Sequence, residues 1–295
     1  MPHIAIRPAR AEDRDTVLAF CQHTWDWGDY IERVWDEWLR DPQGRLFVAT
    51  ADDVPVGVTH VRMLNDTDAW LEGIRVHPAY RQQGIARALN DAMLVEAMQR
   101  GATNARLITE SINTAAIQLV QGKHMRQVGG FLPLSAQPMT QPPEEHYTLD
   151  EPALASEGDL EEIISYLDVS SIFPSTGGLY YHGFTAYGIT DTLLKEQIAA
   201  RQVYLLRRWE RLDGLAIAET REGALGKQLL IGYIDGTTES ISLLAYALRR
   251  QAANMRLDTV RAHVPDLIMV RDAFTGAGYE WEGQTYLTFE RNLGA

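Results

Sequence analysis

The sequence contains a single cysteine, Cys21, among 295 residues. A single cysteine cannot form a disulfide within the chain. The lack of a second cysteine fits a reducing compartment. Long apolar runs are also missing, so no segment is expected to cross a bilayer. The N-terminal residues lack the apolar stretch and the small-residue cleavage site of a secretory signal. We therefore expect a cytoplasmic protein without a membrane partner.

Basic residues are scarce as well. The chain carries 27 Lys and Arg against 40 Asp and Glu, for a formal net charge of −13. A nucleic-acid partner would require a basic face, which this composition does not supply. An acidic protein attracts cations, so an amine-bearing small molecule or peptide is the partner that the charge favours.

The length is sufficient for two domains, each with its own core. Four prolines fall within residues 132–145, with Ser, Thr and Gln between them, which is typical of an extended surface linker. We predict a first domain over residues 1–134, a linker over 135–148 and a second domain over 149–295.

Strands and helices interleave in the first half. Apolar residues recur at helical spacing within 84–100, and Gly101 follows where a left-handed helix cap belongs. We expect helices over 11–24, 29–39, 84–100 and 114–120, and strands near 4–6 and over 45–50, 55–63, 70–76, 104–109 and 128–134. This order predicts an α/β (α+β) fold, with a mixed, mostly antiparallel sheet flanked by helices.

The second half repeats that order weakly. We expect strands over 202–208, 214–219, 228–234, 259–263 and 286–289, and helices over 240–255 and 265–275. Gly278-Tyr279 is the counterpart of Gly130-Phe131 in the first half. The repeat predicts two tandem copies of one fold, an internal pseudo-dimer that could be a monomer or form a homodimer.

The segment with the clearest chemical signal is the strand–loop–helix run over residues 70–89. A loop that ends in a glycine and opens a helix directs several unpaired backbone N–H groups to one point, which suits a phosphate. Gly84 permits close approach of the backbone, and Arg81 can add a charge-assisted contact. The alternative is an ordinary turn in which Pro78 and Gly84 only end the strand and start the helix, without a ligand.

The whole run Val76-x-Pro-x-x-Arg81-x-x-Gly84-x-Ala86 resembles the GNAT superfamily of acyl-CoA-dependent N-acyltransferases, over roughly residues 4–134. The family's phosphate loop, Gln/Arg-x-x-Gly-x-Gly/Ala, is matched at every position. The resemblance implies acetyl-CoA as the cofactor, with no metal. It also implies cofactor contacts from the strand and loop residues and from an Asn that opens the following helix: Ile74, Val76, Arg81, Gln82, Gln83, Gly84, Ile85, Ala86 and Asn113.

One family position is not matched. Members usually carry a Tyr about seven residues after the Asn, and Val120 stands there in this chain. Gly130-Phe131 also comes about five residues late. The tyrosine acid that would reprotonate the CoA thiolate is therefore missing, and either another group or solvent must replace it.

Attack on a thioester requires a neutral amine, so a base must remove a proton from the ammonium. Glu72 is the predicted general base, with a solvated strand glutamate as the alternative. Asp68 and His77 are weaker candidates. Gly73, inside the strand, marks either a bulge that directs an N–H towards the thioester carbonyl or a packing glycine.

The family's acceptor pocket is lined by the first two helices and their loop. Aromatic and acidic side chains in that loop can hold an ammonium. We expect Trp25, Asp26 and Trp27 to contact the substrate, and the later tryptophans to face the core. Cys21 is expected to be a small buried side chain and not a nucleophile.

In the second half, residues 235–241 stand where the phosphate loop should recur. They contain no arginine, and Asp235 and Glu239 would repel a pyrophosphate. Asp266 replaces the helix-opening Asn. We predict that this degenerate copy has lost the cofactor and completes or covers the acceptor site. Residues 173–184 are expected to form a surface loop, which could reach across for that purpose.

The predicted function is transfer of an acetyl group from acetyl-CoA to a primary amine of a small molecule or peptide, by direct attack. The alternative is a non-catalytic acyl-CoA-binding sensor or regulatory module. A phosphate-loop nucleotide enzyme fits poorly, because no Gly-Lys-Ser/Thr sequence follows the loop.

Overall fold

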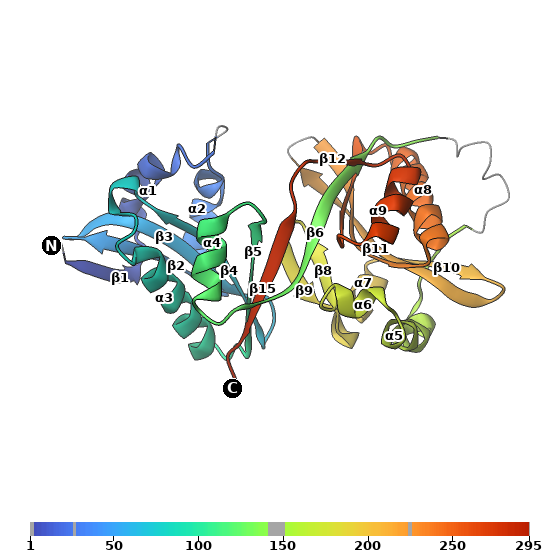
Figure 1. The fold of residues 1–295 in the computed structure, drawn as a ribbon, viewed down its shortest axis with the longest axis horizontal. Helices are drawn as coiled ribbons and strands as arrows, with labels where there is room; N and C mark the ends of the chain where they lie inside the picture. The colour runs from blue at the N-terminus through green and yellow to red at the C-terminus, as the bar shows by residue number, and fades with distance from the viewer. Residues whose placement is uncertain (1–2, 26–27, 141–150, 224–225, 295) are drawn as a thin grey trace. The chain divides into compact units, whose positions relative to one another are not determined.

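A computed structural model describes residues 3–25, 28–140, 151–223 and 226–294. The chain divides into two compact units, each coloured by residue number in Figure 1. The first contains Met1–Leu107, Thr114–Arg126 and Phe289–Ala295, and the second contains Ile108–Asn113 and Gln127–Thr288. Among the described residues, every helix is too short or too polar to span a bilayer.

The first unit follows the predicted order of strands and helices. Its elements are β1 (Ile4–Pro8), η1 (Ala11–Asp13), α1 (Arg14–Cys21), α2 (Ile31–Arg40), β2 (Gly44–Ala51), β3 (Val54–Met63), β4 (Asp68–Val76), η2 (Pro78–Tyr80), α3 (Ile85–Gln99), the start of β5 (Asn104–Glu110), and α4 (Thr114–Gln121). Gly101 has φ +96°, as its predicted capping role requires. The α/β fold class with a mostly antiparallel sheet is confirmed.

Strands β1 to β4 are antiparallel neighbours in sequence order, and β5 lies parallel to β4. The end of β15 (Tyr286–Asn292) completes this sheet beside β5. There Glu290 pairs with Arg106 at 2.8 Å, and the N–H of Leu293 donates to the carbonyl of Thr103. The last seven residues of the chain therefore belong to the unit that begins it.

Helices cover both faces of this sheet (Figure 1). Val58 of β3 packs with the buried residues of α1 and α2. Its neighbours face the opposite side, because successive side chains of a strand alternate. There a Cβ on Gly57 would lie 3.0 Å from Leu89 of α3, and Thr59 contacts Met93. The sheet therefore separates α1 and α2 from α3.

A β-bulge interrupts the pairing of β3 with β4. Val58 pairs with Arg75 and His60 pairs with Glu72, so Thr59 faces two residues of β4. Gly73 lies within this bulge at φ +74°, and a Cβ on it would lie 2.6 Å from the Trp38 ring. Gly73 therefore forms the expected bulge and also makes room for a packed indole, while an N–H directed to a thioester carbonyl stays a prediction.

The second unit contains β6 (Arg126–Ala136, of which Arg126 groups with the first unit), β7 (Ala153–Leu154), η4 (Glu157–Asp159), α5 (Leu160–Asp168), α6 (Ile172–Ser175), β8 (Leu179–His182), β9 (Thr185–Gly188), α7 (Asp191–Ala199), β10 (Val203–Arg208), β11 (Arg211–Gly223), β12 (Gly226–Gly236), α8 (Thr238–Asn254), β13 (Thr259–Val264), α9 (Ile268–Gly276) and β14 (Glu280–Trp281). Its main sheet has the order β6-β13-β12-β11-β10-β7, while β8 and β9 form a separate hairpin.

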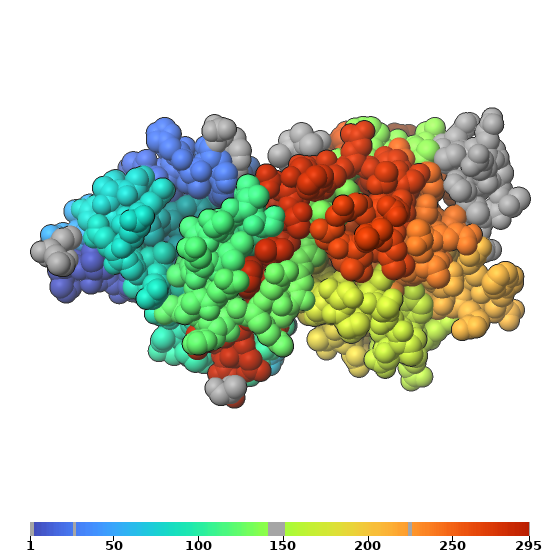
Figure 2. Space-filling model, viewed as in Figure 1, coloured from blue at the N-terminus to red at the C-terminus, as the bar shows by residue number. Residues whose placement is uncertain are grey.

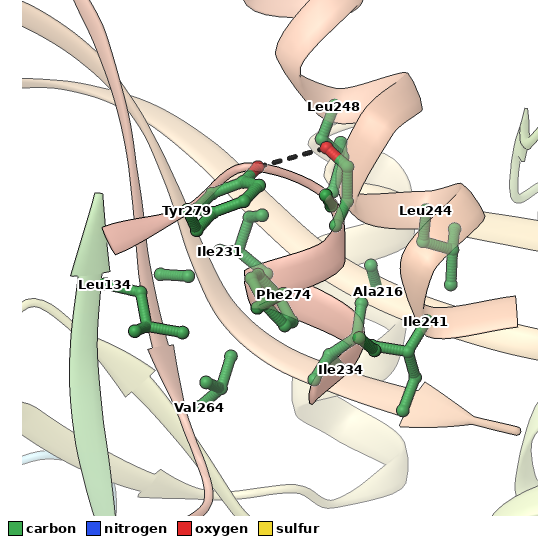
Figure 3. Close-up of a cluster of buried hydrophobic side chains, with 14 of the residues drawn as sticks. Leu134, Ala216, Ile231, Ile234, Ile241, Leu244, Leu248, Val264, Phe274 and Tyr279 are labelled. Carbon is green, nitrogen blue, oxygen red and sulfur yellow. Dashed lines mark hydrogen bonds between the residues drawn. The ribbon is translucent and has the colours of Figure 1, made fainter. Parts of the chain in front are cut away.

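One hydrophobic core of the second unit lies between this sheet and the helices α8 and α9, and another packs α5 and α7 against the sheet. Side chains of the first of these cores converge in Figure 3, where Phe274 of α9 lies near Ile231 of β12 and Ile241 of α8 lies beside Ile234 of the same strand. The buried hydroxyl of Tyr279 donates to the carbonyl of Ala245 at 3.1 Å. The outer side of α9 forms part of the surface in Figure 2.

Two segments differ from the sequence-based expectation. Residues 135–136, predicted as linker, are the end of β6, whereas the strand predicted over 128–134 is confirmed within β6, where Leu132 and Leu134 are buried. Pro133 is accommodated because its carbonyl still accepts from the N–H of Glu282. Residues 173–184 are not a surface loop, because they form part of α6 and β8, where Tyr180 and Tyr181 are buried. Residues 141–148 of the predicted linker lie outside the described residues.

Two glycines with positive φ make a matched test of packing. Gly73→Ala introduces both backbone strain and a collision with Trp38, so we expect about 2–4 kcal/mol of destabilisation. Gly84→Ala, at φ +82°, meets nothing within 4 Å and should cost only about 1–2 kcal/mol. Urea unfolding midpoints of the two variants measure the difference. A larger loss for Gly84→Ala would contradict this account.

Candidate active site

The loop between β4 and α3 has a defined backbone conformation. It begins at His77, whose ring accepts a hydrogen bond from the N–H of Ala79 at 3.2 Å. The short helix η2 follows, and Gln82 and Gly84 then take positive φ values of 62° and 82°. These two left-handed residues turn the chain into α3.

The N-terminus of α3 has no hydrogen-bond partner among the residues that the structure describes. No described residue accepts a hydrogen bond from the backbone N–H groups of residues 82–86, and Gly84 provides no side-chain cap. A Cβ on Gly84 would meet nothing within 4 Å, so the space before the helix is open. Unpaired N–H groups at the positive end of a helix dipole form a site for phosphate oxygens.

Arg81 lies beside this open end and is exposed. Its Nε donates to the carbonyl of Val76 at 3.3 Å, which anchors the side chain to the end of β4. None of the described residues forms an ion pair with its guanidinium. The positive charge therefore remains available to an anion at the α3 N-terminus.

Strands β4 and β5 separate close to this loop. They pair only from Asp68 with Asn104 to Trp70 with Arg106, and no further pair joins them. The edge of β4 that includes Ile74 and Val76 consequently has no strand partner on the β5 side. An extended ligand can hydrogen-bond to such an edge as an added strand would.

Glu72 lies on the face of β4 that α1 and α2 cover, and its side chain is 19% exposed. Oε1 lies 3.0 Å from Nδ1 of His60 and 3.5 Å from Nε of Arg62. No described residue donates a hydrogen bond to Oε2. One carboxylate oxygen is thus held in place, and the other remains available to a ligand.

The two weaker candidates for the base have structural partners. Asp68 is buried and pairs with Arg106 at 2.9 Å, with Asn65 and Asn104 as further donors. The ring of His77 is used in the hydrogen bond to the loop backbone. Both side chains support the ends of β4.

The segment between α1 and α2 is held by an ion pair. The Arg75 guanidinium donates to Asp29 at 2.6 Å and lies 4.6 Å from the centre of the Trp25 ring. Tyr30 stacks on Trp25, and burial raises the pKa of Tyr30 to about 12. An internal cation therefore already covers one face of Trp25. Asp26 and Trp27, the other predicted substrate contacts, lie outside the described residues.

Val120 is buried in α4, so the position of the missing tyrosine is apolar. Asn113 immediately precedes α4, and its N–H donates to the carbonyl of Glu110. Cys21 is 1% exposed, and burial raises the pKa of its thiol to about 12. The interpretation of Cys21 as a buried side chain is confirmed.

The second unit has a β-bulge in the corresponding place. Ile217 pairs with Tyr233 and Ala218 pairs with Ile231, so Gly232 is the extra residue. Counted from this glycine, Ile231 stands where the first unit has Glu72, and Asp235 stands where it has Val76.

The loop that follows is almost absent in the second unit. Strand β12 ends at Gly236 and α8 begins at Thr238, so a single residue, Thr237, separates them. The Thr237 side chain caps the helix by accepting a hydrogen bond from the N–H of Ser240. Asp235 is buried and accepts from Ser170 and Tyr233 at 2.6 Å, and burial raises its pKa. The helix N-terminus that binds phosphate in other proteins is here occupied by the protein's own side chains.

Comparison with known proteins agrees with this geometry. Residues 16–123 match the model of the Acetyltransferase (GNAT) family. This stretch, from α1 to the end of α4, is a GNAT acetyltransferase domain. No curated protein sequence matches the chain.

Solved structures share the fold over nearly the whole length. A GCN5-related N-acetyltransferase from Sphaerobacter thermophilus aligns with a TM-score of 0.60 at 13% identity, covering 98% of this chain and 96% of that one. A GCN5-related N-acetyltransferase from Anabaena variabilis aligns with a TM-score of 0.53 at 11% identity, covering 99% of this chain and 73% of that one. A glucosamine N-acetyltransferase region of a fungal multi-domain β-N-acetylglucosaminidase gives 0.66 at 13% identity, covering 99% and 38%.

Sequence reasoning missed two features of this site. His60 lies within the apolar strand predicted over 55–63, and its inward position in that alternation was the available signal. The pair of Arg75 with Asp29 joins residues 46 positions apart, and no local pattern predicts it.

The lone thiol provides a direct test of the packing of α1. With a pKa of about 12, only about one Cys21 thiol in ten thousand is ionised at pH 8, and the side chain is buried. We expect no reaction with a disulfide thiol reagent in the native protein and one equivalent after unfolding in guanidinium. Rapid labelling of the native protein would show that α1 is packed differently.

Proposed function

We propose that the first unit is an N-acetyltransferase that transfers an acetyl group from acetyl-CoA to a primary amine of a small molecule or peptide. The observation that carries this proposal is the placement of four features along or beside one strand. The bulge at Gly73 and the unpaired edge of β4 lie next to a loop with free N–H groups, and Glu72 lies within the same strand.

The residues fit the cofactor that the family uses. The free N–H groups of residues 82–86, with the Arg81 guanidinium, would bind the pyrophosphate. The backbone at Ile74 and Val76 would pair with the pantetheine arm along the unpaired strand edge. Asn113 is a further proposed contact. Bound there, acetyl-CoA supplies the activated acetyl group.

Glu72 is the proposed general base for direct attack. Its Oε2, which no described residue occupies, would take a proton from the acceptor ammonium and leave the amine neutral. Its Oε1 stays bound to His60. Solvent or another group would return a proton to the leaving thiolate, because Val120 has no acidic hydrogen to give.

Trp25, Asp26 and Trp27 remain the proposed acceptor contacts. The Arg75 guanidinium over Trp25 limits any acceptor ammonium to the remaining surface of that ring. An amine would then be held between the aromatic residues of the α1–α2 segment and the carboxylate of Glu72.

Residues 149–295 are, in this proposal, a diverged second copy that binds no acetyl-CoA. The bulge at Gly232 supports a fold shared with the first unit. The second unit lacks the loop before its helix and has Ile231 at the position of Glu72, which supports the loss of acetyl-CoA binding and of transfer activity. The Thr237 side chain caps the α8 terminus at Ser240, and the buried carboxylate of Asp235 lies at the strand end, where it would repel a phosphate.

A second candidate function is a non-catalytic acyl-CoA sensor. It is favoured by the buried Val120 at the position of the family's acid, since binding alone requires no proton donor there. Turnover distinguishes the two functions.

The first test compares wild type with Glu72→Gln and Arg81→Ala. CoA release from acetyl-CoA is followed with a panel of primary amines, and acetyl-CoA affinity is measured by calorimetry. We expect Glu72→Gln to lower kcat by about 100-fold or more without weakening acetyl-CoA binding. Arg81→Ala should weaken acetyl-CoA binding about 10-fold through loss of a charge-assisted contact.

Tight binding of acetyl-CoA with no accelerated release for any amine would favour the sensor. If Glu72→Gln turns over as fast as wild type, Glu72 is not the general base, but the proposal of an N-acetyltransferase still stands.

The second test concerns the number of sites. We expect one acetyl-CoA per chain by calorimetry, because no described residue accepts from the N–H groups of residues 82–86, whereas Thr237 caps α8 and Asp235 lies at the end of β12. Arg81→Ala serves as the control, since it should weaken that single site. A second equivalent that is insensitive to Arg81→Ala would show that the second unit also binds the cofactor.

A further inference from the structure

The buried imidazole of His60 contacts the proposed base and has no other assigned role. His60 is fully buried in β3. Its Nδ1 lies 3.0 Å from Oε1 of Glu72, and its Nε2 lies 3.4 Å from Oδ2 of Asp41, the residue that follows α2. One ring therefore stands between two carboxylates that come from different elements.

The surroundings fix the plane of this ring. The indole of Trp38 stacks on it with centroids 4.6 Å apart and planes 7° apart. A Cβ on Gly44 would lie 2.6 Å from Nε2 of His60 and 2.4 Å from Oδ2 of Asp41, so only glycine leaves room for their contact. Asp41 is itself held by the N–H of Gln43 at 2.8 Å. The imidazole consequently cannot rotate to another partner without moving its neighbours.

The hydrogen bonds assign the proton on Nδ1. A carboxylate only accepts, so the 3.0 Å contact with Glu72 requires Nδ1–H as the donor. The contact on the Asp41 side is longer and lacks hydrogen-bond geometry. Arg62 of β3 is the other charged group beside Glu72, and Tyr30 is the remaining titratable side chain near it.

We propose that His60 is a positioning residue for Glu72, an inference that rests on the proposed function. The Nδ1–H of His60 holds Oε1, so that Oε2 is directed to the acceptor. When Oε2 takes the ammonium proton, the bond from Nδ1–H to Oε1 persists, and the carboxyl group does not need to reorient during proton transfer. Trp38 and Asp41 serve this role indirectly by holding the imidazole.

Two amide substitutions at His60 test the contacts of the two ring nitrogens separately. In His60→Asn the amide nitrogen can stand near the position of Nδ1 and donate to Glu72. In His60→Gln it reaches the position of Nε2 and faces Asp41. Both variants lose the stacked ring, so they share any loss of stability, which urea unfolding measures.

We expect His60→Gln to lower kcat about 10- to 100-fold, the effect of losing one hydrogen bond to a charged group. His60→Asn should retain most of kcat. The Kd of acetyl-CoA should be the same in both, because the phosphate loop is untouched. In a Glu72→Gln background, His60→Gln should produce no further loss of kcat, since it acts only through Glu72.

Equal kcat values for the two amides, or an undiminished loss in the Glu72→Gln background, would overturn the inference. If wild type turns over no amine, the transferase proposal itself is wrong. If wild type is active and Glu72→Gln matches it, the base assignment is wrong. If activity depends on Glu72 but His60→Gln keeps full kcat, the positioning role alone is wrong.

Discussion

The geometry of the first unit depends on the packing of one indole ring. Trp38 of α2 lies against the backbone of Gly73, where no side chain would fit. Its ring stacks on His60 and meets the edge of Tyr30. One side chain therefore joins the helix layer to the bulge of β4 and to the residue that holds Glu72. The bulge interrupts pairing with β3 beside the edge that β5 leaves open, so the placement of the proposed base and of the strand edge proposed for the cofactor have a common origin.

Much of this arrangement could be predicted from local signals. Pro78, Gly84 and the apolar periodicity of α3 are sufficient to place a strand, a loop and a helix in order. The free N–H groups follow from the loop's glycine and from the absence of a capping side chain at Gly84. Gly73 was also a local signal, because a glycine inside a strand often marks a bulge or a close packing contact. These features are encoded by neighbours in sequence, and the structure agrees with them.

Features that depend on distant contacts could not be predicted. Residues 135–136 resemble the start of a linker, yet they extend a strand because β13 pairs with them. The aromatic segment 173–184 resembles a loop, but Gly232 opens space in which Tyr180 and Tyr181 pack. Likewise, the buried pairs that fix Glu72 and the α1–α2 segment connect different elements. Propensity and periodicity describe a residue's own element and carry no information about its partner.

The last strand has a consequence for how the molecule is made. Residues Phe289–Ala295 belong to the first unit, and Glu290 neutralises the buried guanidinium of Arg106. A ribosome synthesises the N-terminus first, and domains generally fold as they emerge. Here the sheet of the first unit lacks the strand beside β5, and that edge stays open, until residues 289–292 have been synthesised. The first unit therefore cannot complete its sheet before residues 127–288, which lie between its segments in the sequence, have also been synthesised.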